Sequence, residues 1–213
     1  MLKRFSVLLF ALLLPLVACA QETETPVSYQ EGTHYQRLDT PFTTRHPGKV
    51  VINEFFWYGC GHCFSFEPLV TAFTADLPEG IVFEGSPAMW NARMELHARA
   101  YYTAIALGKE AELHEAIFAA INVDRNPLAT EDELADFFAK YGVEPEQFAK
   151  AFNSFGVSSQ VRQADARARS AKIEGTPELV VNGKYRISSR MAGSQAGMLK
   201  VALYLAEKEK AAL

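Results

Sequence analysis

The chain has 213 residues, enough for one or two domains. Apolar residues make up 49% and charged residues 22%, which is ordinary for a soluble globular protein with a core of normal size. The net charge of −4 argues against nucleic-acid or phosphate-rich partners, and no internal repeat or low-complexity tract is visible.

The N-terminal residues 1–20 have the pattern of a secretory signal peptide. Lys3 and Arg4 form a basic start, an apolar run follows over residues 5–17, and small residues end it. This run is shorter than the roughly 20 apolar residues that a membrane-spanning helix needs. We therefore expect residues 1–20 to be removed and the protein to be exported.

Cys19 leaves two forms of the mature N-terminus open. Cleavage after Ala20 would release a soluble protein. The segment Leu16-Val17-Ala18-Cys19 also resembles a bacterial lipobox, in which case a lipoprotein signal, residues 1–18, would be removed and Cys19 would carry the lipid. Because two or three acyl chains hold a protein stably on a membrane, that form would be anchored.

A strand, a helix and a second strand are predicted after an irregular start. Proline and glycine punctuate residues 21–47, which favours an extended or irregular segment. Residues 50–58 form a β-prone run that is apolar on both faces, as in a central buried strand. Apolar spacing then predicts a helix over residues 61–75, kinked by Pro68, and residues 81–85 form a second core strand.

The middle of the chain is predicted to be helical throughout. Residues 90–173 are rich in alanine and glutamate and lack β-branched runs. Thr130 and Glu133 have the spacing of a capping box, and Pro145 suits a first helical position. The expected helices cover residues 91–107, 110–121, 131–141, 145–153 and 158–173.

A hairpin and a final helix complete the pattern. Asn182-Gly183 separates two β-prone runs, residues 178–181 and 184–187, which is a strong signal for a type I′ hairpin. The last helix is expected over residues 195–208. A β-α-β unit, a helical insertion, a hairpin and a helix together make a coherent α/β architecture.

The motif Cys60-Gly61-His62-Cys63 is the sharpest chemical signal in the chain. It lies where a strand gives way to a helix, and the unpaired N–H groups of a helix N-terminus favour negative charge. Because the thiolate is the reactive form of cysteine, this helix end and His62 should both favour an ionised Cys60. Cys60 is therefore the expected attacking sulfur, and Cys63, one turn further in, the resolving sulfur.

A structural disulfide and a metal site are the other readings of this pair. With Cys19 removed or lipidated, the remaining cysteines could close only a four-residue ring, which would constrain the unfolded chain very little. A zinc site needs about four ligands, and no second Cys pair exists. The other histidines are scattered along the sequence (His34, His46, His97 and His114). We expect a redox pair with no metal and no cofactor.

Thr176-Pro177 precedes the hairpin and has two readings. The proline could adopt a cis bond facing the cysteines, with the Thr176 backbone offered to an extended peptide. It could equally be an ordinary trans proline that starts a strand. With Pro177, the side chains of Phe66 and Val70 are expected to offer substrates an apolar, sequence-tolerant surface.

Two glutamates lie close to the cysteines in the sequence. Glu54 is on the predicted buried strand, where a carboxylate is costly unless it is wet, paired or used. It is either a proton relay to Cys63 or a strand-end carboxylate that reaches solvent. Glu67, one turn past Cys63, is expected to be solvated or ion-paired rather than catalytic.

With these pieces in place, the chain resembles the DsbA family of periplasmic thiol:disulfide oxidoreductases in the thioredoxin superfamily. The likeness spans essentially the whole mature chain and is most specific from Asn53 to Glu67 and from Gly175 to Tyr185. It implies a thioredoxin fold with an inserted all-helical domain. It also implies that Cys60 is the nucleophile, Cys63 the resolving cysteine and Pro177 the cis proline, with Glu54 and Glu67 at the positions of the active-site acids.

The resemblance sets the expected domains and function. Residues 21–88 and 174–213 would form the thioredoxin-fold domain and residues 89–173 the helical insertion. A monomeric enzyme in the bacterial periplasm would donate the Cys60–Cys63 disulfide to newly exported proteins and be reoxidised by a DsbB-type membrane quinone reductase.

Other functions stay open from sequence. The family usually has Pro-His between the cysteines, whereas this chain has Gly61-His62, the pair found in protein disulfide isomerases. One alternative is therefore an isomerase or reductase, although residues 21–48 are too short to supply the added dimerisation domain common in such relatives. The non-enzyme alternative is a periplasmic chaperone or binding module.

Overall fold

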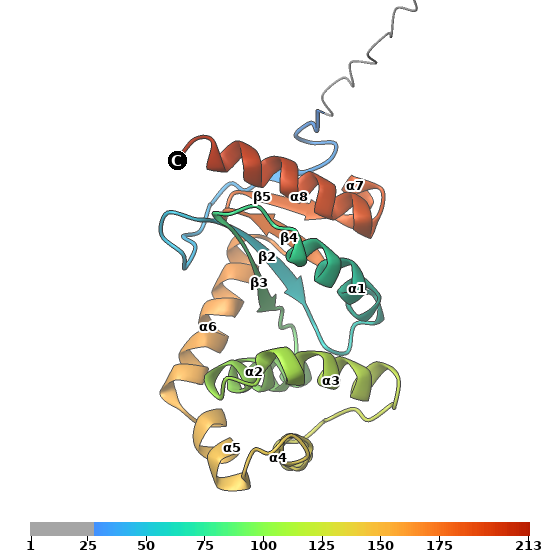
Figure 1. Cartoon of the computed structure of the whole chain (residues 1–213), viewed down its shortest axis with the longest axis vertical. Helices are drawn as coiled ribbons and strands as arrows, with labels where there is room; N and C mark the ends of the chain where they lie inside the picture. Colours follow the sequence, from blue (N-terminus) through green and yellow to red (C-terminus); the bar gives the residue numbers. More distant parts are fainter. Residues whose placement is uncertain (1–27) are drawn as a thin grey trace, which may run out of the picture.

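The computed structural model describes residues 28–213 (Figure 1). The predicted signal peptide and Cys19 lie outside the described residues. Within the described part, no helix combines the length and apolar character needed to cross a membrane. The predicted α/β class is confirmed: a mixed sheet is covered by helices, and a block of further helices lies below it in the view of Figure 1.

Among residues 28–213, five strands form one sheet in the order β1-β5-β4-β2-β3. The central strand β2 (Val50–Phe56) pairs in parallel with β3 (Ile81–Pro87) and antiparallel with β4 (Glu178–Val181). Next to β4 comes β5 (Tyr185–Ser188), and the short β1 (Gln36–Arg37) forms the edge. Every residue of β2 is buried, which confirms the predicted central strand.

The central strand ends two residues earlier than predicted, at Phe56. Trp57 and Tyr58 leave the sheet because their side chains bond to the helical block. Trp57 Nε1 donates to His97 Nδ1 at 3.0 Å, and the Tyr58 hydroxyl lies 3.0 Å from His114 Nδ1. The chain then enters α1 (Gly61–Ala75), which has the predicted bounds.

Helices cover both faces of the sheet. On one face, α1 and the C-terminal α8 (Gln195–Lys210) pack against side chains such as Ile52 and Leu179. On the other face, the end of α6 (Phe155–Ser170) packs with Phe55 and Val180. Neighbouring positions of one strand thus serve opposite faces, as the pleat requires.

The residues between β3 and β4 form the predicted helical block. Thr130 Oγ1 accepts from the Glu133 N–H at 3.1 Å, and Pro145 is the first residue of its helix, as expected. The last helix of the block begins three residues before the prediction because Ser154 caps it, accepting from the Val157 N–H at 3.1 Å. The helices are α2 (Ala92–Ala106), α3 (Glu110–Asn122), α4 (Glu131–Ala139), α5 (Pro145–Phe152) and α6.

The predicted hairpin is present with one difference. Asn182 and Gly183 have φ of 51° and 64°, and the Lys184 N–H donates to the Val181 carbonyl at 2.9 Å, as in a type I′ turn. Strand pairing begins at Val181 and Tyr185, so three residues rather than two connect the strands. The one-turn helix α7 (Ser189–Ala192) and the edge strand β1 are not among the predicted elements.

Candidate active site

Cys60 lies at the junction of the β2 connection and α1, as its N-cap residue. The preceding turn is closed by the Cys60 N–H, which donates to the Trp57 carbonyl at 2.9 Å. Gly59 is required in this turn because a Cβ there would collide with the Trp57 indole. Cys60 is half-buried and Cys63 is fully buried, both as free thiols, so the predicted difference in access is confirmed.

Hydrogen bonds converge on the Cys60 sulfur. The Cys63 N–H donates to Cys60 Sγ at 3.3 Å, and the Cys60 thiol lies 3.3 Å from the carbonyl oxygen of Thr176. The hydrogen bond from the Cys63 side chain outweighs burial and, helped by the Thr176 side chain and by the N–H groups of Cys63 and His62, lowers the pKa of Cys60 to about 5. Cys60 is therefore a thiolate at neutral pH, as the helix N-terminus predicted.

Cys63 has the opposite character. Burial, followed by its hydrogen bond to Cys60 and the Cys60 charge, raises the pKa of Cys63 far above that of a free thiol. Cys63 therefore keeps its proton while Cys60 gives its proton up. When the two cysteines are joined as a disulfide, a thiolate can attack the accessible Cys60 sulfur. The buried Cys63 sulfur then leaves as a thiolate and must take up a proton.

The bond between Thr176 and Pro177 is cis, the reading that the family resemblance implied. The loop before it is tied down by Arg186 on β5, whose guanidinium donates to the Lys172 carbonyl. The same guanidinium lies 3.6 Å from a Glu174 carboxylate oxygen and 3.8 Å from one of Glu178. Arg186 thereby holds the segment that places Thr176 against Cys60.

Sequence reasoning missed Glu178 as a site residue. Burial, only partly offset by Arg186, raises the pKa of Glu178 to about 7. The signal was present in the sequence, because Glu178 opens an otherwise apolar strand just as Glu54 interrupts one. A cleft of about 850 Å³ lies beside this loop, lined by Thr176, Pro177 and Glu178 together with Arg190 and Met191.

Glu54 is only 3% exposed, so the alternative of a strand-end carboxylate in bulk solvent is wrong. Its Oε1 atom takes no hydrogen bond from the described residues. Burial, followed by the charges of Glu67 and Cys60, raises the pKa of Glu54 well above that of a free carboxyl. The side chain lines a cavity of about 420 Å³, which gives water a way to it.

Glu67 is ion-paired, as the sequence predicted. Its Oε2 lies 3.3 Å from His114 Nε2, and both side chains line the cavity that Glu54 also reaches. The histidine comes from α3 of the helical block, and sequence reasoning did not select it. No signal near the Cys motif points to it, because its contact with α1 is made by the tertiary fold.

His62 is exposed, and its contacts are made by its backbone. Its carbonyl accepts from Gln195 Nε2 at 2.6 Å, and its N–H supports the Cys60 sulfur. The imidazole is not among the groups that bond to Cys60. A role for the His62 ring in stabilising the thiolate therefore stays a prediction.

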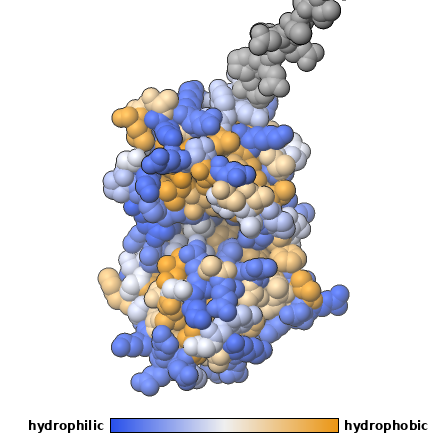
Figure 2. All heavy atoms as spheres, viewed as in Figure 1, coloured by the Kyte–Doolittle hydropathy of each residue, from blue (hydrophilic) through white to orange (hydrophobic). Residues whose placement is uncertain are grey.

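The expected apolar surface does not come from Phe66 and Val70. Phe66 is 0% and Val70 8% exposed, because these positions of α1 face the core of the sheet. Leu69, between them in sequence, is 39% exposed. Figure 2 shows apolar side chains among the polar ones on the upper half of the molecule, where α1 and α8 lie.

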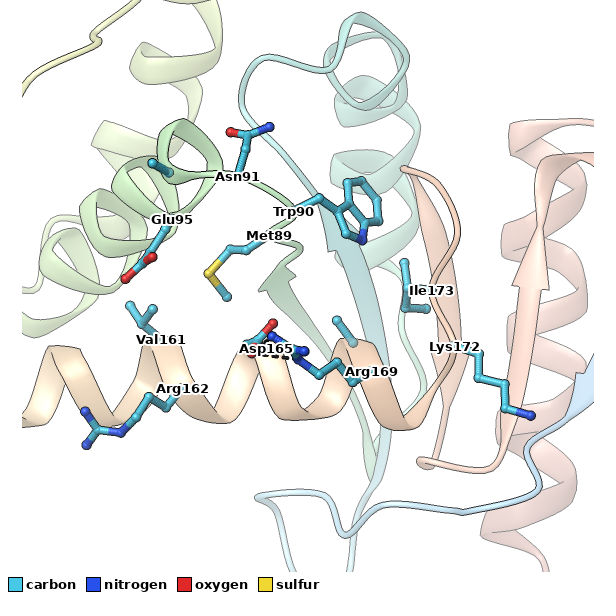
Figure 3. Close-up of a pocket in the computed structure, with 12 residues that line it drawn as sticks. Met89, Trp90, Asn91, Glu95, Val161, Arg162, Asp165, Arg169, Lys172 and Ile173 are labelled. Atoms are coloured by element: carbon cyan, nitrogen blue, oxygen red, sulfur yellow. Dashed lines mark hydrogen bonds and ion pairs between the residues drawn. The ribbon is translucent and has the colours of Figure 1, made fainter.

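A second cleft, of about 650 Å³, opens between the start of α2 and α6. Trp90 stands beside Ile173 at its edge and is 54% exposed (Figure 3). Asp165 and Arg169 form an ion pair across its floor at 2.8 Å. Among residues 28–213, no three His, Cys, Asp or Glu side chains are grouped as metal ligands would be.

Comparisons with known proteins agree with this geometry. A family model described as a DSBA-like thioredoxin domain matches residues 74–198. The thiol:disulfide interchange protein DsbA of Azotobacter vinelandii is 40% identical over 191 residues, covering 90% of this chain and 89% of its own. The crystal structure of Pseudomonas aeruginosa DsbA superposes with a TM-score of 0.81 at 39% identity, covering 86% of this chain and 96% of that one. The DsbA structure of Xylella fastidiosa gives a TM-score of 0.80 at 32% identity, over 86% of this chain and 98% of that one.

Proposed function

Because the chain belongs to the DsbA family of thiol:disulfide interchange proteins, we propose that Cys60 and Cys63 carry its reaction. The protein is a thiol:disulfide oxidoreductase of disulfide bond formation. Its substrates are newly exported proteins whose thiols it oxidises. The observation that supports this assignment of residues is the contrast between a Cys60 thiolate and a buried, protonated Cys63.

The reaction proceeds in two exchanges. A substrate thiolate attacks Sγ of Cys60 in the oxidised enzyme, the Cys60–Cys63 bond breaks, and Cys63 leaves as a thiolate that takes up a proton. A second substrate thiolate then attacks the substrate sulfur of the mixed disulfide, so that the substrate disulfide forms and Cys60 leaves as a thiolate. Two electrons pass to the enzyme. The low pKa of Cys60 makes it a good leaving group.

Glu54 is the acid we assign to Cys63. Since its pKa is raised, Glu54 is protonated far above the usual carboxyl range and can supply the proton that the Cys63 thiolate needs. The charge of Glu54 is also among the causes that raise the pKa of Cys63. In the reverse direction, when the enzyme is reoxidised, the Glu54 carboxylate accepts the proton back.

The substrate lies as an extended segment against the cis-proline loop. The Thr176 backbone faces Cys60, so a peptide bonded there would present its cysteine to the reactive sulfur. The adjoining cleft and the exposed Leu69 offer room and apolar contact for neighbouring residues. These contacts would suit many sequences, as an enzyme with varied substrates requires.

The setting of this reaction follows from the family. We place the protein in the bacterial periplasm as a monomer, soluble or held by lipid on Cys19, and reoxidised by a DsbB-type membrane quinone reductase. We also assign residues 89–173 to an inserted domain between thioredoxin parts 21–88 and 174–213. The apolar cores support this division, since α2 to α6 share one core while α1, α8 and the sheet share another. Phe56, Tyr58 and Cys63 join the first core, where the two parts meet.

Single-cysteine variants test the assignment. The oxidised wild type should form disulfides in a reduced, unfolded exported protein, while Cys60→Ser should form none. Cys63→Ser should accumulate a mixed disulfide through Cys60 when offered a substrate disulfide, because the resolving sulfur is missing. A Cys60→Ser variant that still oxidises the substrate at the wild-type rate would overturn the assignment of Cys60. A Cys60–Cys63 disulfide as resistant to glutathione as a structural one would remove the oxidase assignment.

A further inference from the structure

His114 lines the same cavity as the glutamates of β2 and α1 although it comes from a different part of the fold. It lies on α3 of the helical block and lines the same cavity as Glu54 and Glu67. Rings surround it edge-on: Phe56 at 5.2 Å, Phe118 at 5.1 Å and Tyr101 at 5.8 Å between centroids. These aromatic contacts fix the plane of the imidazole and therefore the directions in which its nitrogens point.

Both ring nitrogens have partners that suit either protonation state. Nε2 lies 3.3 Å from a Glu67 carboxylate oxygen, and Nδ1 lies 3.0 Å from the Tyr58 hydroxyl. In the imidazolium, Nδ1–H donates to the Tyr58 oxygen and Nε2–H faces Glu67 as an ion pair. The neutral ring that remains after Nε2 gives up its proton keeps the same Nδ1–H bond to Tyr58. The ring can thus gain or lose a proton without moving.

Two carboxylate oxygens in the cavity are left for water. Glu54 Oε1 and Glu67 Oε1 are buried and take no hydrogen bond from the described residues. Both side chains face the cavity of about 420 Å³, which is large enough for several waters. A proton path from His114 through Glu67 and water to Glu54 therefore has a polar group at each step.

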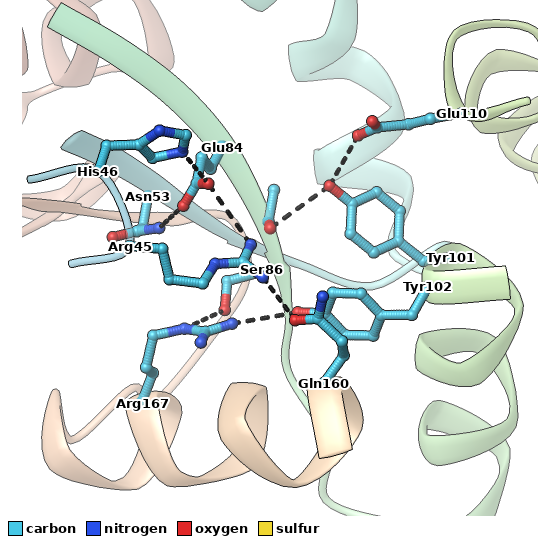
Figure 4. A network of polar contacts seen from close by, with 11 residues as sticks. Arg45, His46, Asn53, Glu84, Ser86, Tyr101, Tyr102, Glu110, Gln160 and Arg167 are labelled. Carbon is cyan, nitrogen blue, oxygen red and sulfur yellow. Dashed lines mark hydrogen bonds and ion pairs between the residues drawn. The ribbon is translucent and has the colours of Figure 1, made fainter. Parts of the chain in front are cut away.

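The remaining charged groups lie along the cavity wall. Figure 4 shows Glu84 bonded by His46 at 2.7 Å and by Arg45 at 3.4 Å, so this carboxylate is already neutralised. On the other side, the Tyr101 hydroxyl donates to Glu110 at 2.9 Å (Figure 4). Among these wall residues, His114 is the basic side chain that lies beside Glu67.

We propose that His114 is a positioning residue that supplies protons to Glu54 through Glu67 and cavity water. When Cys63 leaves as a thiolate it takes the Glu54 proton, and the Glu54 carboxylate is reprotonated by water. That water regains a proton from Glu67, Glu67 takes one from Nε2 of the His114 imidazolium, and solvent reprotonates the neutral ring. On reoxidation the proton returns by the same route. This inference rests on the proposed roles of Cys63 and Glu54.

The test is the pH dependence of one exchange step in the full-length protein. Reduction of the Cys60–Cys63 disulfide by glutathione would be followed by tryptophan fluorescence between about pH 5 and 8, where a histidine titrates. After correction for the thiolate fraction of glutathione, the wild-type rate constant should rise as the pH falls through the histidine range. In His114→Gln this rise should disappear, with about a tenfold lower rate constant at the acid end.

The matched control is His97→Gln, which alters a buried histidine of the helical block that is bonded to Trp57 and does not line the cavity. It should keep the wild-type pH profile. Glu67→Gln is the second variant and should also lose the rise, because an amide cannot pass a proton from His114 to the cavity water. A folded His114→Gln protein with the wild-type pH profile would overturn the inference, and so would a wild-type profile in Glu67→Gln should His114→Gln fail to fold. If the Cys60–Cys63 disulfide of the wild-type protein did not exchange with glutathione at all, the proposed function itself would be overturned.

Discussion

Two sulfurs one helical turn apart differ because of what each touches. Cys60 receives N–H groups at the start of α1 and the Cys63 side chain, whereas Cys63 lies in the core without comparable donors. In the proposed mechanism this difference assigns the attack to Cys60 and the stored proton to Cys63.

The Cys60 pKa has a direct optical test. In the reduced protein, the ultraviolet absorbance of the thiolate should titrate with a midpoint of about 5. The physical reason is that the hydrogen bonds to Sγ are stronger when the sulfur is charged. The signal should be absent in Cys60→Ser, and a midpoint near the ordinary value of 9.0 would contradict the account of this sulfur.

The same shift makes the reduced protein's stability depend on pH. Because the folded pKa of Cys60 is depressed to about 5 from 9.0, its contribution is complete above about pH 9 and is lost as the pH falls toward 5. The free energy of unfolding of the reduced protein, measured in urea relative to Cys60→Ser, should therefore rise between these limits. Glu178 titrates in both proteins, so its opposite trend cancels in the comparison. A flat difference would refute the linkage.

At the scale of single residues, the sequence predicts which side chains are reactive better than it predicts which side chains they contact. Cys60 and Cys63 are placed by a local strand-to-helix junction, which a pattern can identify. The Arg186 and Glu178 contacts, and that of His114 with Glu67, arise only when distant elements meet. Phe66 and Val70 failed as surface residues for a related reason, since helical spacing shows a face but not which neighbour covers it.

At the scale of the element, α1 combines an active-site end with a core-facing side. Phe66 lies in the core and Leu69 faces outward at 39% exposure. Phe66→Ala should therefore lower the free energy of unfolding by about 3–5 kcal/mol through lost burial and a cavity. Leu69→Ala should cost under about 1 kcal/mol yet weaken peptide binding. Urea titrations and peptide-oxidation kinetics would measure both, and equal stability losses would contradict the burial pattern.

Predicted elements were most accurate where local signals end them. Proline at the start of α5 and the capping bond of Thr130 fix helix ends from within the chain. The two-residue β1 and one-turn α7 are too short for any periodicity to mark them. β2 ended early because Trp57 and Tyr58, although β-prone, bond to helices that a local pattern does not place.

At the scale of the whole molecule, Glu209 near the C-terminus joins α8 to the hairpin. Its carboxylate accepts from Asn182 at 2.7 Å, from Tyr185 at 2.9 Å and from Lys184 at 2.5 Å. Burial opposes ionisation, but these bonds together lower the pKa of Glu209. The hairpin that follows the cis-proline loop is thereby held to the last helix.

Glu209→Gln should destabilise the protein by about 2 kcal/mol at neutral pH, because charge-assisted bonds to the hairpin are lost. Glu207→Gln is the matched control, an exposed glutamate on the same helix, and should change stability by less than about 0.5 kcal/mol. Chemical denaturation would measure the free energy of unfolding of both variants. Equal effects would mean that the Glu209 network adds nothing to stability.

The place of β4 in the sheet has a consequence for biogenesis. The central strand is laid down early, but its antiparallel neighbour, which brings Thr176 to the active-site sulfur, follows the entire helical block. Pairings so remote along the chain form late. Until β4 has been made, Cys60 therefore has the neighbouring N–H groups of α1 but lacks its contact with Thr176. The cis-proline side of the site is completed only when nearly the whole polypeptide is available.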